Sequence, residues 1–165
     1  MIIVLLAEGF EEIEALTPVD ILRREGFEVM TVGVTGKIVR GSHGIEVISD
    51  ALPEEIDLSS VEMAVFPGGM PGSLNLDSSE YTDRVISAML DKGGKLAAIC
   101  AAPLIFGRRG VLRGKHATCF PGFESELVGA TVTGENFVTD GNITTGKGMT
   151  VSLEFSRELV RVLKA

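Results

Sequence analysis

The fold of this chain is decided by the stretch Gly94-Lys95-Leu96-Ala97-Ala98-Ile99-Cys100-Ala101-Ala102-Pro103. Its apolar run is typical of a short strand that is buried on both faces of a sheet. Pro103 suits the first turn of a helix, where a missing N–H leaves no hydrogen bond unmade. A strand that turns directly into a helix, with a nucleophilic side chain at the junction, forms a nucleophile elbow. We therefore predict such an elbow with the thiol of Cys100 at its tip.

The residues alone leave two interpretations of Cys100 open. The start of a helix favours negative charge, so a thiol at an elbow is expected to ionise more readily than a free one. Free cysteine is also among the most buried residue types and often only fills space. The predicted strand-to-helix junction is compatible with Cys100 as a reactive thiol and with Cys100 as a packing residue.

The overall composition fits one globular domain spanning residues 1–165. Hydrophobic residues make up 45 % of the chain and charged residues 23 %, which are ordinary values for a globular protein. A net charge of −8 argues against nucleic acid or an anionic membrane as a partner, since either would need a basic face. No apolar run approaches the roughly 20 residues that span a bilayer. The apolar start, residues 1–7, lacks the basic residues of a signal peptide.

Cysteine usage indicates a reducing compartment. The chain has two cysteines, Cys100 and Cys119, which are too few for a disulfide framework and have no metal-ligand spacing. We expect both thiols to be reduced, the protein to be cytoplasmic, and the site to hold no metal and no cofactor.

Strands and helices alternate along the chain. We predict buried strands at 2–7, 27–33, 63–66 and 94–99, and helices at 11–24, 79–92, 101–108 and 149–163. Two hairpins are expected, one within 37–48 and one around Asp140-Gly141, together with a strand over 115–120. This alternation predicts an α/β fold whose mostly parallel sheet has helices on both faces.

The helix at 11–24 is predicted to be amphipathic. Ile13, Leu16, Val19 and Leu22 fall near helical spacing, and acidic residues occupy the first turn. Taken alone, Glu14 in that turn is most simply a solvated residue.

Three loops are expected to meet at the carboxyl ends of the strands, where such folds bind ligands. They are residues 8–14, the Pro67-Gly68-Gly69 turn and the elbow. Gly68 and Gly69 allow the backbone to approach a ligand closely, and the N–H of Ala101 lies one residue past the thiol. Together these amides would form an oxyanion hole for an adduct on Cys100. The other interpretation is that Pro-Gly-Gly only turns the chain.

Five motifs, taken together, resemble one family over essentially the whole chain. They are Gly9-Phe10-Glu11-Glu12-Ile13-Glu14, Pro18-Val19-Asp20, Pro67-Gly68-Gly69, Ala98-Ile99-Cys100-Ala101-Ala102-Pro103 and Gly146-Lys147-Gly148. The set resembles the ThiJ/PfpI superfamily, and most closely its DJ-one branch, the relatives of the parkinsonism-associated deglycase. The resemblance implies a flavodoxin-like three-layer sandwich with an elbow like that of class I glutamine amidotransferases. It also implies a homodimer.

The resemblance assigns roles to individual residues. The reactive, easily oxidised cysteine of the family falls on Cys100, and the acid that hydrogen-bonds it falls on Glu14. The oxyanion-hole amides fall on Gly69 and Ala101, and Gly68 and Gly148 lie at the periphery of the site. A protonated Glu beside a thiolate can donate a hydrogen bond that stabilises the thiolate or its sulfinate.

The sequence departs from the family at a histidine. The DJ-one branch has a histidine before the proline that matches Pro121, where this chain holds Cys119 or Phe120. The peptidase-like branch has histidine directly after the cysteine, where this chain has Ala101. Cys119 is either a resolving thiol for oxidised Cys100 or a packing residue.

Neither of the two histidines of the chain replaces the missing one. His116 falls in an expected strand and is interpreted as structural. His43 lies in the hairpin, near the place where the family has a basic residue at the dimer-side rim of the site. It is kept as a peripheral candidate.

Three functions follow from these observations. The first is glyoxalase- or deglycase-like action on reactive carbonyls, namely α-oxoaldehydes or their adducts on proteins, through Cys100 and Glu14. The second is a redox sensor or stress-response chaperone that responds to oxidation of Cys100 without turnover. The third, an intracellular cysteine peptidase, would need a histidine that reaches Cys100.

Overall fold

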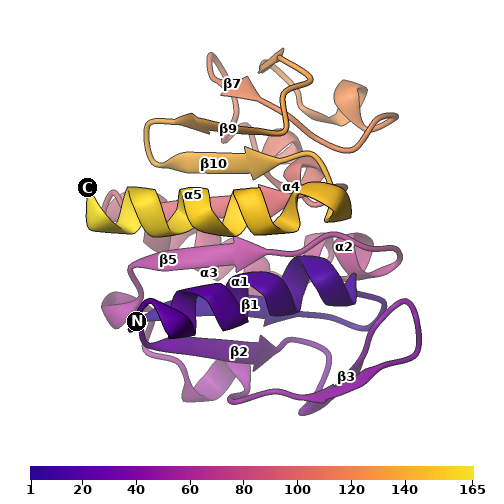
Figure 1. Cartoon of the computed structure of the whole chain (residues 1–165), viewed down its shortest axis with the longest axis vertical. Helices are drawn as coiled ribbons and strands as arrows, with labels where there is room; N and C mark the ends of the chain where they lie inside the picture. Colours follow the sequence, from indigo (N-terminus) through magenta and orange to yellow (C-terminus); the bar gives the residue numbers. More distant parts are fainter.

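The computed structural model describes residues 1–165 and is built on a six-stranded sheet with strand order β2-β1-β5-β6-β10-β9. These strands are β1 (Ile2–Leu6), β2 (Val29–Gly33), β5 (Met63–Phe66), β6 (Lys95–Ile99), β9 (Phe137–Asp140) and β10 (Ile143–Gly146). Only β9 runs antiparallel to its neighbour, and all other pairs are parallel (Figure 1). Apart from that edge strand, the order is that of flavodoxin-like folds.

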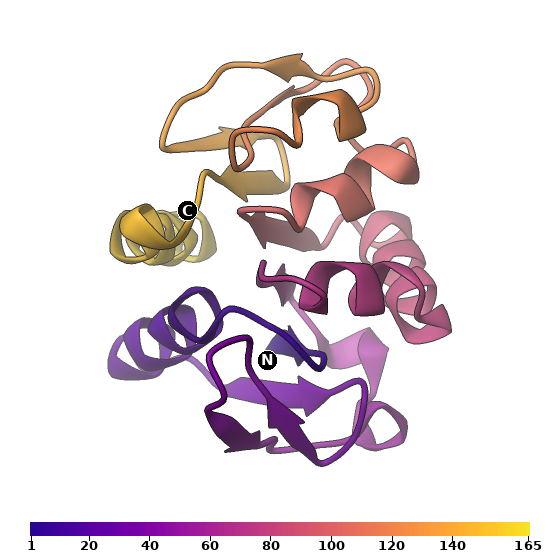
Figure 2. The ribbon, with the colours of Figure 1, turned by 90° about the vertical axis from the view of Figure 1, so that its right-hand side faces the viewer.

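Helices cover both faces of the sheet and complete three layers (Figure 2). On one face, α1 (Glu12–Arg24) packs against α5 (Ser152–Lys164). The other face carries α2 (Gly72–Asp77), α3 (Glu80–Asp91) and α4 (Pro103–Arg108). The predicted α/β sandwich is confirmed.

The hydrophobic core lies in two clusters, one on each face of the sheet. Along β1, Ile3 and Leu5 point into the cluster beneath α3 and α4, whereas Ile2, Val4 and Leu6 point into the one beneath α1 and α5. All residues of β1 and β5 are buried, as expected for central parallel strands. The core therefore holds the carboxyl ends of these strands in fixed positions.

Shorter elements surround this sandwich. The hairpin predicted within 37–48 forms as β3 (Ile38–Arg40) and β4 (Glu46–Ile48). A second small sheet pairs β7 (His116–Ala117) with β8 (Thr131–Val132). Single 3₁₀ turns span Pro53–Glu55, Leu58–Ser60, Glu124–Glu126 and Met149–Val151. No helix is both long enough and apolar enough to cross a membrane.

Two predicted elements differ from the structure. The strand expected over 115–120 is limited to the two residues of β7, because from residue 118 onward the chain bonds to β10 and to the elbow. Helix α2 was not predicted, since its sequence follows a Gly-Pro-rich turn and has no clear apolar period.

The buried side of α1 also differs from the prediction. Val19 and Leu22 are buried as expected, but Ile13 is exposed and Leu16 only half-buried. The first turn is rotated so that Glu12 and Glu14 point inward. Two acidic residues thus lie on the buried side of the first turn, where the pattern placed Ile13.

Candidate active site

Cys100 lies at the tip of the elbow between β6 and α4. It is the one non-glycine residue with a positive φ, at 66°. That conformation costs a residue with a side chain of order 1 kcal/mol or more, and such outliers gather at functional sites. The N–H of Cys100 donates to the carbonyl of Gly146 at 2.9 Å, and its carbonyl accepts from the N–H of Phe120 at 2.8 Å. The predicted elbow is present, with its thiol partly exposed.

Glu14 reaches Cys100 from the first turn of α1. Only 1 % of its surface is exposed, and its carboxyl is hydrogen-bonded to the thiol. One oxygen, Oε2, accepts the N–H of Gly68 at 2.9 Å. Burial raises the pKa of Glu14 to about 7, since a charged carboxylate loses its hydration there. The carboxyl therefore exchanges its proton near neutral pH.

The Pro67-Gly68-Gly69 turn after β5 supplies the third side of the site. The N–H groups of Gly69 and Ala101 both hydrogen-bond to the sulfur of Cys100. A Cβ on Gly68 would lie 2.4 Å from Oε2 of Glu14 and 2.6 Å from Cβ of Cys100. Gly69 has a φ of +92°, which a side chain would disfavour. The turn thus needs glycine to bring its amides to the sulfur.

The thiol is less acidic than the sequence led us to expect. Burial and the Glu14 carboxylate both raise the pKa of Cys100, and the Ala101 and Gly69 amides only partly offset this. The Ala101 amide, just before α4, lowers the thiol pKa as the sequence led us to expect. Burial and Glu14 raise it by more. When Glu14 is ionised, the proton stays on the sulfur.

Phe120, and not Cys119, lies beside the site. The N–H of Phe120 bonds to the carbonyl of Cys100, and its ring is 3.1 Å from the position that a Cβ on Gly148 would take. Cys119 is buried in the core cluster under α4, where burial raises the pKa of its thiol to about 11. Gly148 lies against this ring, two residues after the Gly146 that bonds to Cys100.

Neither histidine bonds to Cys100. His43, in the turn between β3 and β4, places Nδ1 at 2.9 Å from Glu12 and 3.5 Å from Glu11. The hydrogen bond to Glu12 raises the pKa of His43. His116 bonds to Asp140 instead. The site therefore has no imidazole base.

Glu11, Glu12 and His43 have ligand atoms within 4.8 Å of one another, a spacing that a metal ion could use. The Glu12 carboxylate already accepts the backbone N–H of His43 at 2.7 Å and lies next to His43 Nδ1. These bonds explain the cluster as a means of holding the hairpin turn against α1. We assign it no metal.

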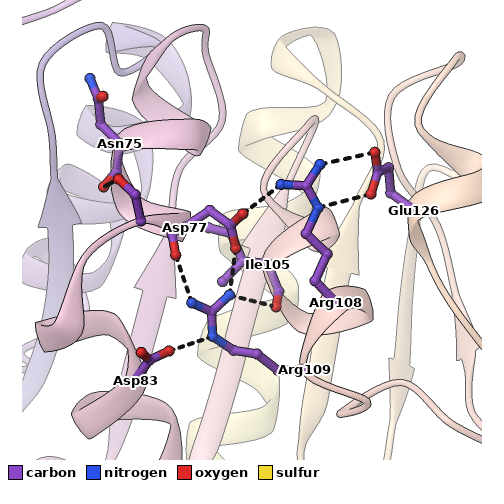
Figure 3. A network of polar contacts seen from close by, with 8 residues as sticks. Asn75, Asp77, Asp83, Ile105, Arg108, Arg109 and Glu126 are labelled. Atoms are coloured by element: carbon purple, nitrogen blue, oxygen red, sulfur yellow. Dashed lines mark hydrogen bonds and ion pairs between the residues drawn. The ribbon is translucent and has the colours of Figure 1, made fainter.

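A charged network ties α2 to α4 at the ends that lie away from the site (Figure 3). The Asp77 carboxylate accepts hydrogen bonds from both Arg108 and Arg109. Arg108 also donates two hydrogen bonds to Glu126, and Arg109 donates one to Asp83. Because α2 follows the glycine turn and α4 follows the elbow, the network fixes the two segments that carry the amide donors.

Comparison with known proteins agrees with this geometry. The chain matches the DJ-1/PfpI family over residues 1–162. It is 36 % identical to Protein DJ-1 homolog B of Arabidopsis thaliana, covering 98 % of this chain but only 38 % of that protein. It is 31 % identical to a deglycase of Pyrococcus abyssi, covering 99 % of both.

Solved structures show the same likeness. Oxidised DJ-1 of Toxoplasma gondii superposes with a TM-score of 0.92 at 31 % identity, covering 98 % of this chain and 89 % of that one. The range that the family model matches contains α1, the glycine turn and the elbow. The chain is therefore a member of the DJ-1/PfpI family.

Proposed function

We propose that this protein acts on reactive carbonyls through Cys100, in the manner of a glyoxalase or deglycase. The observation that carries the proposal is the hydrogen bond between the Cys100 thiol and a buried carboxyl, Glu14, with a pKa of about 7. A group that titrates near the working pH is the most effective proton carrier. The deglycase name of the Pyrococcus abyssi relative supports the same chemistry.

In the first step, Cys100 adds to the aldehyde carbon of an α-oxoaldehyde. The Glu14 carboxylate takes the thiol proton as the C–S bond forms and the C=O π electrons move to oxygen. The amides of Gly69 and Ala101, which converge on the sulfur, stabilise the charge that develops beside it. Glu14 then returns its proton to that oxygen and leaves a neutral hemithioacetal.

Proton transfers by Glu14 complete the turnover without an external oxidant. The carboxylate removes the hydrogen from the former aldehyde carbon and delivers it to the neighbouring ketone oxygen, which gives an enediol. Glu14 then takes the hydroxyl proton of the sulfur-bearing carbon and delivers it to the neighbouring carbon. This gives a thioester of a 2-hydroxy acid, and water hydrolyses the thioester to release Cys100. The net reaction is α-oxoaldehyde plus water to 2-hydroxy acid. For an early adduct on an amine, the same attack expels the amine, which takes up the proton.

The decisive experiment measures methylglyoxal consumption over many equivalents of substrate. Wild-type protein is compared with Cys100→Ser and with Cys119→Ala, the matched control for the other thiol. Sustained consumption that is lost in Cys100→Ser and kept in Cys119→Ala is the expected result. Stoichiometric or absent consumption by reduced wild-type protein would reject the enzymatic proposal for this substrate.

A second function is favoured by the donors around the sulfur. Two amides and the protonated Glu14 are arranged to hydrogen-bond a sulfinate on Cys100 as well as an oxyanion. Under this proposal, Cys100 is a redox sensor or a switch for chaperone activity. Mild peroxide would then add two oxygen atoms to Cys100 alone, as measured by peptide mass spectrometry, in a protein that shows no turnover.

We also propose that the chain forms a homodimer through the exposed side of α1. A surface cavity of about 470 Å³ there is lined mainly by apolar residues, among them Ile13, Leu16, Ile45 and Leu153. Exposed apolar clusters of this kind mark interaction surfaces. Sedimentation should show a dimer that Ile13→Glu disrupts, whereas a wild-type monomer would reject this interface.

A further inference from the structure

A separate cavity of about 280 Å³ adjoins the elbow. It is lined by Phe120, Pro121, Lys147, Gly148, Met149 and Thr150. Phe120 and Met149 are 47 % and 49 % exposed, so two large apolar side chains stand open to solvent in one small hollow. Such exposure leaves apolar surface that a ligand can cover.

Both walls of this cavity are attached to the backbone of Cys100. The Phe120 wall is held by the hydrogen bond from its N–H to the carbonyl of Cys100, at 2.8 Å. The opposite wall, Lys147 to Thr150, follows Gly146, whose carbonyl accepts the N–H of Cys100 at 2.9 Å. The cavity is therefore anchored on two sides to the backbone of the residue that carries the thiol.

The residues that line the cavity indicate which chemical groups it can bind. Lys147 is the one ionisable residue in it, and its ammonium group donates to the carbonyl of Gly134. Besides Gly148 and Thr150, the lining consists of the Phe120 ring, the Met149 thioether and Pro121, which favour an apolar or aromatic group. The hollow is large enough, since an apolar cavity of about 150 Å³ accommodates benzene.

We infer that this cavity is a specificity subsite that binds the apolar or aromatic substituent of the carbonyl compound attacked by Cys100. The inference rests on the proposed function and adds a substrate class to it: aryl- and larger alkyl-α-oxoaldehydes are preferred over methylglyoxal. Phe120, which stands where the family resemblance places a histidine, determines the preference by stacking on the substituent.

The test compares the kcat/KM for phenylglyoxal with that for methylglyoxal. Phe120→Ala and Met149→Ala should each lower the ratio of the two values about tenfold, the scale on which a hydrophobic pocket discriminates. Leu90→Ala removes a similarly exposed apolar side chain from α3 and should leave the ratio unchanged. Turnover of both substrates with a ratio that is insensitive to Phe120 and Met149 would overturn the subsite while leaving the proposed function intact.

A second measurement is independent of turnover. The rate at which Cys100 is alkylated is measured by mass spectrometry with iodoacetamide and with N-benzyl iodoacetamide. The subsite predicts a benzyl-to-parent rate ratio that falls about tenfold in Phe120→Ala and stays constant in Leu90→Ala. Equal ratios in wild type and Phe120→Ala would reject the inference, whether or not the protein is an enzyme.

Discussion

Helices α2 and α4 connect two polar clusters that differ in how their charges are balanced. Near their amino ends, the buried Glu14 and the partly exposed Cys100 share a site that contains no cation. At their carboxyl ends, Arg108 and Arg109 are surrounded by Asp77, Asp83 and Glu126 at the surface (Figure 3). The first cluster is an acid without a counter-ion, and the second has a carboxylate partner for every guanidinium.

The two clusters differ in whether their carboxyl groups can change protonation state near neutral pH. Because burial raises the pKa of Glu14 to about 7, that carboxyl gains and loses a proton near neutral pH. In the network, hydrogen bonds from Arg108 lower the pKa of Glu126, which therefore stays ionised. The pair is suited to proton transfer, and the network to holding the helices that follow the Gly69 and Ala101 amides.

The largest expected effect comes from removing the proposed proton carrier, Glu14. Glu14→Gln keeps an oxygen that can accept the N–H of Gly68 but cannot take up a proton. We expect kcat/KM for methylglyoxal to fall about 1,000-fold, within the range of general acid–base catalysis. The variant should remain folded, as monitored by circular dichroism. A fall of less than about tenfold would show that another group moves the proton.

The same substitution should change how stability depends on pH. The folded-state pKa of Glu14 is about 7 against an ordinary value of 4.5, so the native state binds the extra proton between those values. Its contribution to stability is complete below pH 4.5, declines as the pH rises to 7, and is constant above that. By linkage the loss is about 3 kcal/mol.

Urea unfolding of wild type and Glu14→Gln at several pH values measures this effect. The difference in unfolding free energy should move by about 3 kcal/mol in favour of Glu14→Gln between pH 4 and pH 8. Groups that are not coupled to Glu14 cancel in the difference, and Cys100, whose pKa burial raises, stays protonated over this range. Parallel stability curves would contradict a raised pKa at Glu14.

The sequence predicted the elbow and the glycine turn because their signals are local. A short apolar run ending in Cys100-Ala-Ala-Pro, and the Pro67-Gly68-Gly69 turn, constrain the backbone directly. The parallel sheet followed from the alternation of strands and helices. These features required no knowledge of contacts between distant residues.

The features that sequence reasoning missed depend on such contacts. The apolar spacing of α1 predicted that Ile13 points inward. Glu14 points inward instead, because it bonds to the turn after β5 and to the thiol, and these contacts cannot be read from the spacing. The choice between Cys119 and Phe120 depended on which residue bonds to the carbonyl of Cys100. The raised pKa of the thiol likewise arises from burial in the folded protein and from a carboxyl 86 positions away in the sequence.

The charged network should respond to substitution in stability and little in activity. Asp77→Asn leaves Arg108 and Arg109 without the carboxylate they share, and we expect a loss of about 2 kcal/mol, the scale of hydrogen bonds to charged groups. Asp83 is 62 % exposed, so Asp83→Asn should cost no more than about 0.5 kcal/mol. Both values come from urea unfolding.

If the network is separate from the site, the stability cost of Asp77→Asn should depend on pH and on salt in two specific ways. Its effect should be the same at pH 5 and pH 8, because both arginines stay charged over that range. It should also shrink in 1 M salt, since the network is at the surface. A cost that changes with pH in parallel with that of Glu14→Gln would mean that the two clusters are not separate.

The smallest expected effect is a shift in the pH midpoint of Cys100 alkylation. It is the most informative about Glu14 and Cys100, because the direction of the shift shows whether Glu14 stabilises the thiol or the thiolate. The Glu14 carboxylate is one cause of the raised pKa of Cys100, so Glu14→Gln should move the pH midpoint of Cys100 alkylation to a lower value, by about one unit. The measurement uses iodoacetamide and a Cys119→Ala background, which leaves one thiol. A shift to higher pH would mean that a proton donated by Glu14 stabilises the thiolate, as the sequence analysis first suggested. A shift to lower pH, together with the loss of turnover, would mean that Glu14 restrains the thiol while carrying the protons of the reaction.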